Sequence, residues 1–375
     1  MKNLILSTTP VDLTNVIPGV NYNTTTSATT YNKVPILFGN KINYTTSGNT
    51  VMTFDTIKMF GSTDNQLNIL SNVYENGLGT TTFDDKIITV SSALCSGNTD
   101  ITSITVPGRI NNLNCNNIFE GCYNLSGVSL NTSNVTNMSN MFNMCYNLSG
   151  VSLNTSNVTN MSYMFVDCSN LSGVSLNTSN VTNMRHMFNY CTNLSGVSLN
   201  TSNVTDMSGM FYYCRNLSGV NLSDISNVTN MSSMFGGCRN LSGITLDTSN
   251  VTDMSSMFSS CINLSGVSLN TSNVTNMSEM FRGCNKLKNI EMTNFGKASG
   301  LTGSVNFSST IWGSGTTAEE IAVNTQSIRN TLITNSYDRA TVGYSVLTIT
   351  LSTYTKGLLT DAEKAQITAK GYTIA

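Results

Sequence analysis

The sequence predicts an α/β repeat solenoid, a stack of short parallel strands and short helices, and two observations carry this prediction. The stretch NLSGVSLNTSNVTNMSNMFNMCY, residues 124–146, returns with few changes up to about residue 290. A fixed period of this length is typical of solenoids, because a single unit cannot bury its apolar face alone. Cysteines keep the same period, with steps of 23 residues and one step of 24: Cys122, Cys145, Cys168, Cys191, Cys214, Cys238, Cys261 and Cys284.

Each repeat is predicted to contain a strand, a turn and about two turns of helix. In residues 124–146, Val128 and Leu130 keep the two-residue period of a strand. Four later apolar residues have the i, i+3, i+4, i+7 spacing of a short amphipathic helix: Met138, Met141, Phe142 and Cys145. Thr136 or Asn137 is placed to cap that helix with a side-chain oxygen. The polar Asn and Ser positions also repeat, so we expect them to bond from rung to rung.

The cysteines are predicted to form a reduced ladder inside the stack, because free Cys packs as a small hydrophobe. Two alternatives are a disulfide between neighbouring rungs and a soft metal such as Cu(I) held by Met and Cys sulfurs. Parallel inward side chains aim their sulfurs poorly at each other, and the sulfurs recur at fixed core positions like Phe and Leu. We therefore expect no metal and no cofactor.

The array is predicted to be closed at both ends. Residues 101–122 form a degenerate first unit, in which Ile104 and Val106 take the strand positions and Cys115 takes the position of Met138. A one-residue insertion in LSDISNV, residues 222–228, is expected to form a surface bulge.

Beyond residue 292 we expect a cap made of helices and a strand. Residues 318–333 have amphipathic spacing, and residues 346–353 alternate as a strand does. A last helix is predicted with Thr360 and Glu363 as a capping box and Gly371 as its stop.

The domain organisation follows from these boundaries. Residues 1–90 are rich in Thr, Asn and Gly, with short alternating segments at 33–40 and 49–60, and are predicted to be a β-rich attachment region. The remaining divisions are the N-terminal cap and degenerate first repeat at 91–123, the solenoid at 124–292, and the C-terminal cap at 293–375.

The repeat resembles that of the BspA-like leucine-rich repeat proteins, whose bacterial "surface protein" unit reads much like TSNVTNMSxMFxxC. The match covers residues of about 100 to 292. The resemblance implies a leucine-rich-repeat-like stack and a surface-exposed, adhesive role in bacteria, some protists or phage-encoded proteins. The C-terminal tail is similar to the cap of such proteins in phages and gut-type bacteria.

Composition and motifs argue against several classes of function. Only 10% of residues are charged and the formal net charge is −2, so we expect no nucleic-acid partner. No stretch approaches the roughly 20 apolar residues that span a bilayer, and the apolar run Leu4–Leu6 is short for a secretory signal, so we expect neither membrane insertion nor Sec export. The single histidine, His186, is expected to be an exposed imidazole, and carboxylates are scattered. The chain is therefore predicted not to be an enzyme.

Binding is the remaining class, and variation between the repeats indicates where to look. Differences concentrate on the expected helix and just after each Cys. Tyr and Arg are enriched at recognition hot spots. The candidate binding ridge consists of Tyr146, Tyr163, His186, Tyr190, Tyr212, Tyr213, Arg215, Arg239 and Arg282. The alternative is that these positions are simply free to drift.

The leading hypothesis is a phage virion protein, a fibre or appendage. Its N-terminal region would dock to other virion proteins, while the solenoid contacts a glycan or protein of the host surface. Homo-oligomers, trimers by analogy with phage fibres, are one expectation. The alternatives are a bacterial cell-surface adhesin and a cytosolic scaffold.

Overall fold

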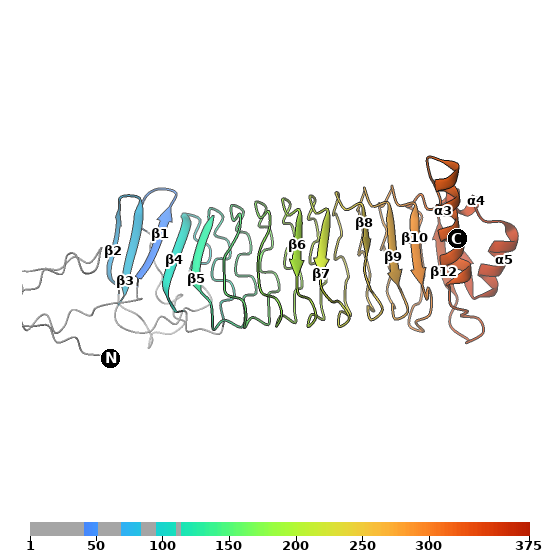
Figure 1. Ribbon diagram of the computed structural model, residues 1–375, viewed down its shortest axis with the longest axis horizontal. Coiled ribbons are helices and arrows are strands. Elements are labelled where there is room, and N and C mark those ends of the chain that lie inside the picture. The colour runs from blue at the N-terminus through green and yellow to red at the C-terminus, as the bar shows by residue number, and fades with distance from the viewer. Residues whose placement is uncertain (1–40, 52–68, 84–94, 110–113) are drawn as a thin grey trace, which may run out of the picture. The chain divides into compact units, whose positions relative to one another are not determined.

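The repeats form a solenoid in which each unit is one rung of a stack, so the predicted fold class is confirmed (Figure 1). The computed structural model describes residues 41–51, 69–83, 95–109 and 114–375, which all lie in one compact unit, Gly39–Ala375. The segment expected at 33–40 lies outside the described residues, and so do residues 52–60 of the segment expected at 49–60.

Parallel strands of successive rungs pair along one side of the stack. β4 (Ile101–Arg109) pairs with β5 (Gly127–Asn131), with Ile104 opposite Val128, so the degenerate first unit keeps the predicted register. The later strands are β6 (Gly196–Leu199), β7 (Gly219–Leu222), β8 (Gly243–Thr245), β9 (Gly266–Asn270) and β10 (Asn289–Thr293).

Two repeats lack the predicted strand. Residues 173–176 form none, and in the preceding rung Ser152 forms only an isolated bridge to Ser129. These rungs are held elsewhere, because an unbroken series of parallel bridges runs through the stack at one polar position. Its members are Asn114, Asn137, Asn160, Asn183, Asp206, Asn230, Asp253 and Asn276. In this series the Asn137 side-chain oxygen accepts the Ser139 N–H at 3.0 Å, so the predicted capping residue closes a turn.

The segment predicted to be a short helix is a run of tight turns, and that prediction is wrong. Alternate N–H groups donate to the next rung, as the Phe142 N–H does to the Met164 carbonyl at 2.9 Å. The N–H groups between them donate three residues back, as Cys145 does to Phe142 at 3.0 Å. An α-helix would instead bond each N–H to the residue four positions earlier. A neighbouring rung at about 4.8 Å supplies these partners.

Each turn segment contains two residues with left-handed backbone, here called the first and second left-handed positions. In residues 124–146 they are Asn140 (φ 54°) and Met144 (φ 62°), and the same two positions have positive φ in every rung through Glu279 and Gly283. A right-handed helix cannot contain such residues. The apolar side chains keep helix-like spacing and nevertheless point inward from turns.

The core consists of columns of identical side chains. The Leu, Val, Met, Phe and Cys that recur at the same turn positions in every rung are fully or almost fully buried. Phenylalanines stack from Phe119 through Phe281 to Phe307 of the cap, with ring centroids 5.5–6.0 Å apart. Cys115 is also fully buried, as expected for a core substitution.

The cysteine column is buried and hydrogen-bonded. Each thiol donates to the carbonyl of the preceding rung's Phe position, as Cys145 does to Phe119 at 3.1 Å. Cys122 donates in the same way to Cys95 at 3.0 Å, so Cys95 occupies the Phe position of a partial rung ahead of the degenerate unit. All ten cysteines are free.

The inserted residue of the long repeat lies on the surface, as predicted. Ser223 forms an exposed bend directly after β7. The carbonyl of Asp224 then accepts the Thr201 hydroxyl, as Asn carbonyls accept Thr hydroxyls in other rungs.

Antiparallel strands cover the first rung. β1 (Lys41–Thr46) pairs with β4 on one side and with β3 (Leu78–Phe83) on the other, and β2 (Ile69–Glu75) pairs with β3. The sheet order is β2-β3-β1-β4-β5, so these strands extend the sheet of the array.

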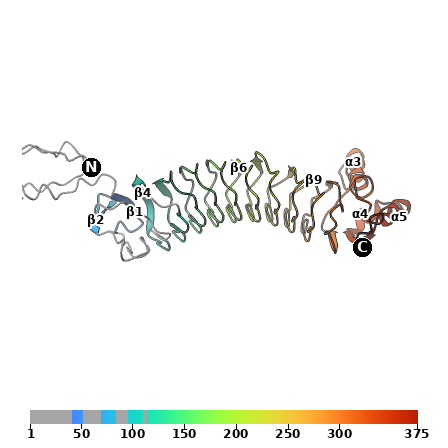
Figure 2. The same ribbon diagram turned by 90° about the horizontal axis from the view of Figure 1, so that it is seen from below.

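The C-terminal cap contains the two predicted helices and the predicted strand, together with elements that the sequence did not predict (Figures 1 and 2). Parallel strands β11 (Ser304–Phe307), β12 (Leu347–Leu351) and β13 (Tyr372–Ile374) form one sheet. The remaining elements are α3 (Ala318–Arg329), the π-helical turn η2 (Asn330–Thr334), α4 (Thr353–Gly357) and α5 (Asp361–Ala369). The Thr360–Glu363 capping box is present, and Gly371 (φ 88°) follows the helix.

Candidate binding surface

The nine residues of the candidate ridge lie on the turn segments, at four positions of the rung. The first left-handed position holds Tyr163 and His186, and the second holds Tyr190 and Tyr213. Tyr212 and Arg282 directly follow the Phe of their rung, and Tyr146, Arg215 and Arg239 follow the Cys.

Tyr163 and His186 form one aromatic row. Their rings stack with centroids 5.0 Å apart, and the guanidinium of Arg185 lies 6.0 Å from the Tyr163 ring. The next residue of the row is Gly209, where an added Cβ would lie 2.2 Å from the His186 ring. The ring therefore packs on glycine backbone, and His186 is half-buried rather than exposed as predicted.

The environment of His186 favours neutral imidazole. Burial lowers its pKa, the neighbouring Arg185 lowers it further, and Asp206 acts in the opposite direction. Nδ1 lies 2.9 Å from the Asn189 amide nitrogen, which suits a neutral ring that accepts this hydrogen bond.

Three tyrosines, Tyr190, Tyr212 and Tyr213, form a cluster close to the second left-handed position of the rung. Tyr190 stacks on Tyr213 at 4.9 Å, and Tyr212 meets Tyr213 edge-on at 4.7 Å. Tyr212 and Tyr213, which share a rung, both lie over glycines of the next rung. A Cβ added to Gly236 would lie 2.8 Å from the Tyr212 ring, and one added to Gly237 would lie 3.0 Å from the Tyr213 ring. Rings and glycines thus fit each other across consecutive rungs.

The arginines continue this cluster. The Arg215 guanidinium lies 5.7 Å from the Tyr213 ring. Arg239 occupies the post-cysteine position of the next rung, because the following N–H, that of Asn240, donates to the Arg215 carbonyl at 3.1 Å. We call Tyr190, Tyr212, Tyr213, Arg215 and Arg239 the tyrosine–arginine patch.

The remaining candidates lie apart from this patch. Tyr146 stacks on Tyr123 at 5.0 Å, and both are exposed. Arg282 forms an ion pair with Glu279 at 3.2 Å near the C-terminal end of the array.

Sequence reasoning missed several residues of these clusters. Tyr123 follows Cys122 as Tyr146 follows Cys145, so its position was readable from the repeat. Arg185 stands where the neighbouring repeats have Ser, and Asn189 is the hydrogen-bond partner of His186. Gly209, Gly236 and Gly237, on which the rings pack, could not be recognised from the sequence, because the orientation of the rings along the stack is visible only in the structure.

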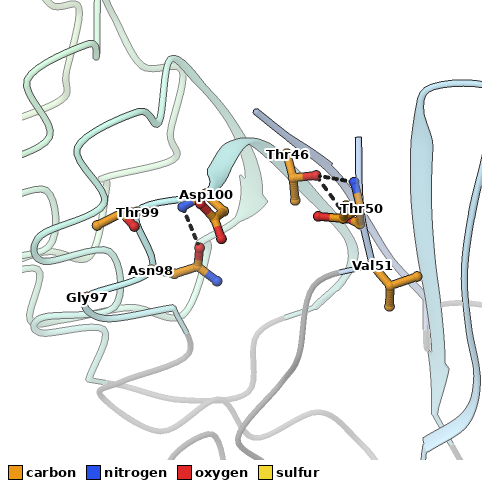
Figure 3. Close-up of a pocket in the computed structure, with 7 residues that line it drawn as sticks. All are labelled: Thr46, Thr50, Val51, Gly97, Asn98, Thr99 and Asp100. Atoms are coloured by element: carbon orange, nitrogen blue, oxygen red, sulfur yellow. Dashed lines mark hydrogen bonds between the residues drawn. The ribbon is translucent and has the colours of Figure 1, made fainter. Parts of the chain in front are cut away.

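Two cavities in the described part of the chain are polar. One of about 280 Å³ lies where the turn after β1 meets the partial first rung, lined by Thr46, Thr50, Val51, Gly97, Asn98, Thr99 and Asp100 (Figure 3). Polar side chains of this cavity form hydrogen bonds with nearby backbone, as Asn98 Oδ1 does when it accepts the Asp100 N–H at 3.0 Å. The second, about 230 Å³, is lined by Glu279, Arg282, Asn306 and Ser309.

Burial keeps the thiols of the core in their neutral form. Burial raises the pKa of the Cys115, Cys122 and Cys284 thiols to about 12. Among the residues that the structure describes, no three His, Cys, Asp or Glu side chains are grouped to hold a metal ion. No helix in the described ranges is both long and apolar enough to traverse a bilayer.

Comparison with solved structures finds leucine-rich repeat proteins. A leucine-rich cell-surface protein of Faecalibacterium prausnitzii is 23% identical with a TM-score of 0.35, over 48% of this chain and 56% of that protein. A leucine-rich repeat protein of Bacteroides ovatus is 17% identical with a TM-score of 0.26, over 55% of this chain and 61% of its own. The chain therefore spans less than two thirds of either protein. No curated protein matches it.

A family model matches more than half of the chain. The matched residues are 113–220 and 215–310, which include every complete repeat. The model is described as "Mycoplasma protein of unknown function, DUF285". The match agrees with the resemblance of the TSNVTNMSxMFxxC unit to BspA-like repeats. The chain belongs to this BspA-like leucine-rich repeat family.

Proposed function

We propose that the chain is a bacterial cell-surface binding protein, which adheres through the tyrosine–arginine patch of its solenoid. The observation that carries this is the patch itself, in which Tyr190, Tyr212, Tyr213 and Arg215 contact one another on a surface made mostly of Asn, Ser and Thr. Exposed Tyr and Arg are the side chains that dominate recognition surfaces. The surface location is carried over from the BspA-like resemblance of the repeat.

The rings and glycines of the patch also argue against random drift. A bulky ring at one rung is followed by Gly at the same position of the next at Gly209, Gly236 and Gly237. Two of these pairs lie in the patch and the third lies beside it, so rings and glycines of neighbouring rungs fit each other. A built surface is better explained by binding than by unconstrained variation.

Location is tested by labelling intact cells of the organism that encodes the chain with an antibody raised against the solenoid. Labelling of unpermeabilised cells supports the proposal. Phage particles purified from the same culture are analysed by mass spectrometry, since the virion hypothesis predicts the chain there. Detection in particles together with unlabelled cells would replace the cell-surface proposal by the virion one.

Adhesion is tested with the triple variant Tyr212→Ala, Tyr213→Ala and Arg215→Ala, which should lower attachment of the purified chain to target cells at least tenfold. A matched control changes the same three rung positions two rungs later, Ser259→Ala, Ser260→Ala and Ile262→Ala. Equal attachment by both variants would remove the patch from the proposal.

A further inference from the structure

The post-cysteine side of the rung carries basic residues without acidic ones. In the eight segments that run from the residue after each Cys to the Ser or Lys before the strand, there are four basic residues and no Asp or Glu: Arg215, Arg239, Lys286 and Lys288. Lys288 pairs with Glu320. Within the described residues, neither Arg215 nor Arg239 has an ion-pair partner. The net charge of −2 makes this local excess more pronounced.

Arg215 and Arg239 stand on consecutive rungs, about 4.8 Å apart along the stack. Like charges on neighbouring rungs repel each other, and a nearby carboxylate would offset the repulsion. Arg282 has such a carboxylate, Glu279, at 3.2 Å. Among the described residues the pair at 215 and 239 lacks one, so an anion bound between the two side chains would be attracted by both charges.

The tyrosines orient the first of these arginines. The Arg215 guanidinium lies 5.7 Å from the Tyr213 ring, which stacks on Tyr190 at 4.9 Å and rests on the backbone of Gly237. A guanidinium held near a fixed ring loses less conformational freedom when it binds. Its planar fork of donors matches the paired oxygens of a carboxylate or sulfate.

The surroundings favour an extended polar ligand. Neither described cavity includes a residue of the tyrosine–arginine patch. The patch presents phenol rings and guanidinium groups from turn segments, and not the apolar groove or free strand edge that binds a helix or an added strand. Arg215 and Arg239 repeat at the rung spacing, which suits a polymer whose acidic groups also repeat.

We infer that Tyr190, Tyr213, Arg215 and Arg239 bind an anionic polysaccharide, with the arginines on its carboxylate or sulfate groups and the tyrosine hydroxyls on its sugar hydroxyls. This inference rests on the proposed function and names the class of ligand for the same surface. The contacts follow the stack from the rung of Tyr190 to that of Arg239.

Calorimetric titration of the full chain tests this with four probes at 50 and 300 mM NaCl: hyaluronate, heparin, neutral dextran and poly-glutamate. We expect binding to at least one charged polysaccharide, weaker at the higher salt concentration because exposed charges are screened, and none to dextran. Arg215→Gln with Arg239→Gln should weaken binding about tenfold or more, since each change removes charge-assisted hydrogen bonds. Arg282→Gln, the control with its own carboxylate partner, should bind as the unchanged chain does.

Three results would overturn the inference: no binding to either charged polysaccharide, binding to poly-glutamate at equal strength, or an unchanged affinity of the double arginine variant. Circular dichroism of each variant verifies that the solenoid is folded. If the chain labels cells and adheres through the patch but ignores both charged polysaccharides, the proposed function stands and only the ligand class is wrong. If the chain binds a charged polysaccharide through the arginines but is absent from the cell surface, the ligand class stands and the proposed function is wrong.

Discussion

At the scale of single residues, glycine decides where an aromatic ring can lie along this stack. Other rungs carry Asn, Tyr, His, Ser or Glu at the position of Gly209, so left-handed backbone alone does not require glycine there. What requires it is the His186 ring, which covers the place of a Cβ. The same reasoning applies to Gly236 and Gly237 beneath Tyr212 and Tyr213.

Gly209→Ala should push the His186 ring off its support. The new Cβ would lie 2.2 Å from the ring, so we expect the free energy of unfolding to fall by about 1–3 kcal/mol. The pKa of His186 should rise toward its usual value as the ring loses burial, and NMR titration follows it cleanly because the chain has one histidine. Gly97→Ala (φ 75°) is the control, since nothing lies within 4 Å of its Cβ. An unmoved histidine pKa would contradict the packing described.

The buried thiols should make stability depend on alkaline pH. Folding raises the pKa of Cys115, Cys122 and Cys284 from 9.0 to about 12, so the folded state favours the neutral thiol. This contribution is complete below pH 9 and is lost as the pH rises through about 12. The urea concentration at the midpoint of unfolding should therefore decrease as the pH is raised from 8.5 to 10.5.

The buried cysteines should also be protected from alkylation. Iodoacetamide at pH 8 should label the ten cysteines only after unfolding, and rapid labelling of the native chain would refute the buried ladder.

At the scale of elements, the turn segment shows where sequence reasoning succeeds and where it fails. The apolar positions were predicted correctly, because inward spacing of i, i+3, i+4 and i+7 arises from a helix and also from consecutive turns. What the pattern could not reveal is that half of the N–H groups bond to another rung. A signal existed in the Asn, Gly, Ser and Asp found at the two left-handed positions, since these residues tolerate positive φ.

The caps and the binding surface were predictable to different degrees. The capping box at Thr360 and Glu363 depends only on local sequence, so it was readable without the structure. The joining of β1 to β4 depends on pairing between residues far apart in the chain, and no local pattern specifies it. The candidate residues could be named from variation, but their grouping follows from which rungs are neighbours and which way the rings lean.

Removing one ring from the phenylalanine column should destabilise the array. Phe188 is fully buried between Phe165 and Phe211, with centroids 5.6 and 5.7 Å away. We expect Phe188→Ala to lower the free energy of unfolding by about 3–5 kcal/mol, measured by urea denaturation. Tyr354→Ala, at an exposed ring of the cap, should change it by less than about 0.5 kcal/mol. Similar losses in both variants would be inconsistent with a continuous core column.

At the scale of the whole array, the rungs are interchangeable because each contacts mainly its neighbours. The Phe and Cys columns present the same residue to either neighbour, and the polar bridge column presents Asn or the isosteric Asp. Stability is then approximately a sum of rung and interface terms. The ends differ, since antiparallel strands close one and helices with parallel strands close the other.

Deletion of residues 147–169, one complete period of 23, should leave a folded solenoid. Tyr146 would then precede Asn170, so every later side chain keeps its position in the rung. Circular dichroism should stay solenoid-like, and small-angle scattering should show a body shorter by about 4.8 Å. Deletion of residues 147–158 is the control, because it removes about half a rung and leaves the turn segment without its strand side. An unfolded product of the full-period deletion would contradict rung interchangeability.

The left-handed positions also restrict how such a surface can diversify. Val, Ile and Thr are absent from both positions in all eight rungs between Asn117 and Gly283. Branching at Cβ makes positive φ costly, so these residues are excluded on steric grounds. The residues found there are Tyr, His, Asn, Ser, Asp, Glu, Met and Gly, which strain the backbone less at positive φ than β-branched residues do. New binding specificities at these two positions must therefore come from a set of residues that is rich in polar and aromatic side chains and poor in aliphatic ones.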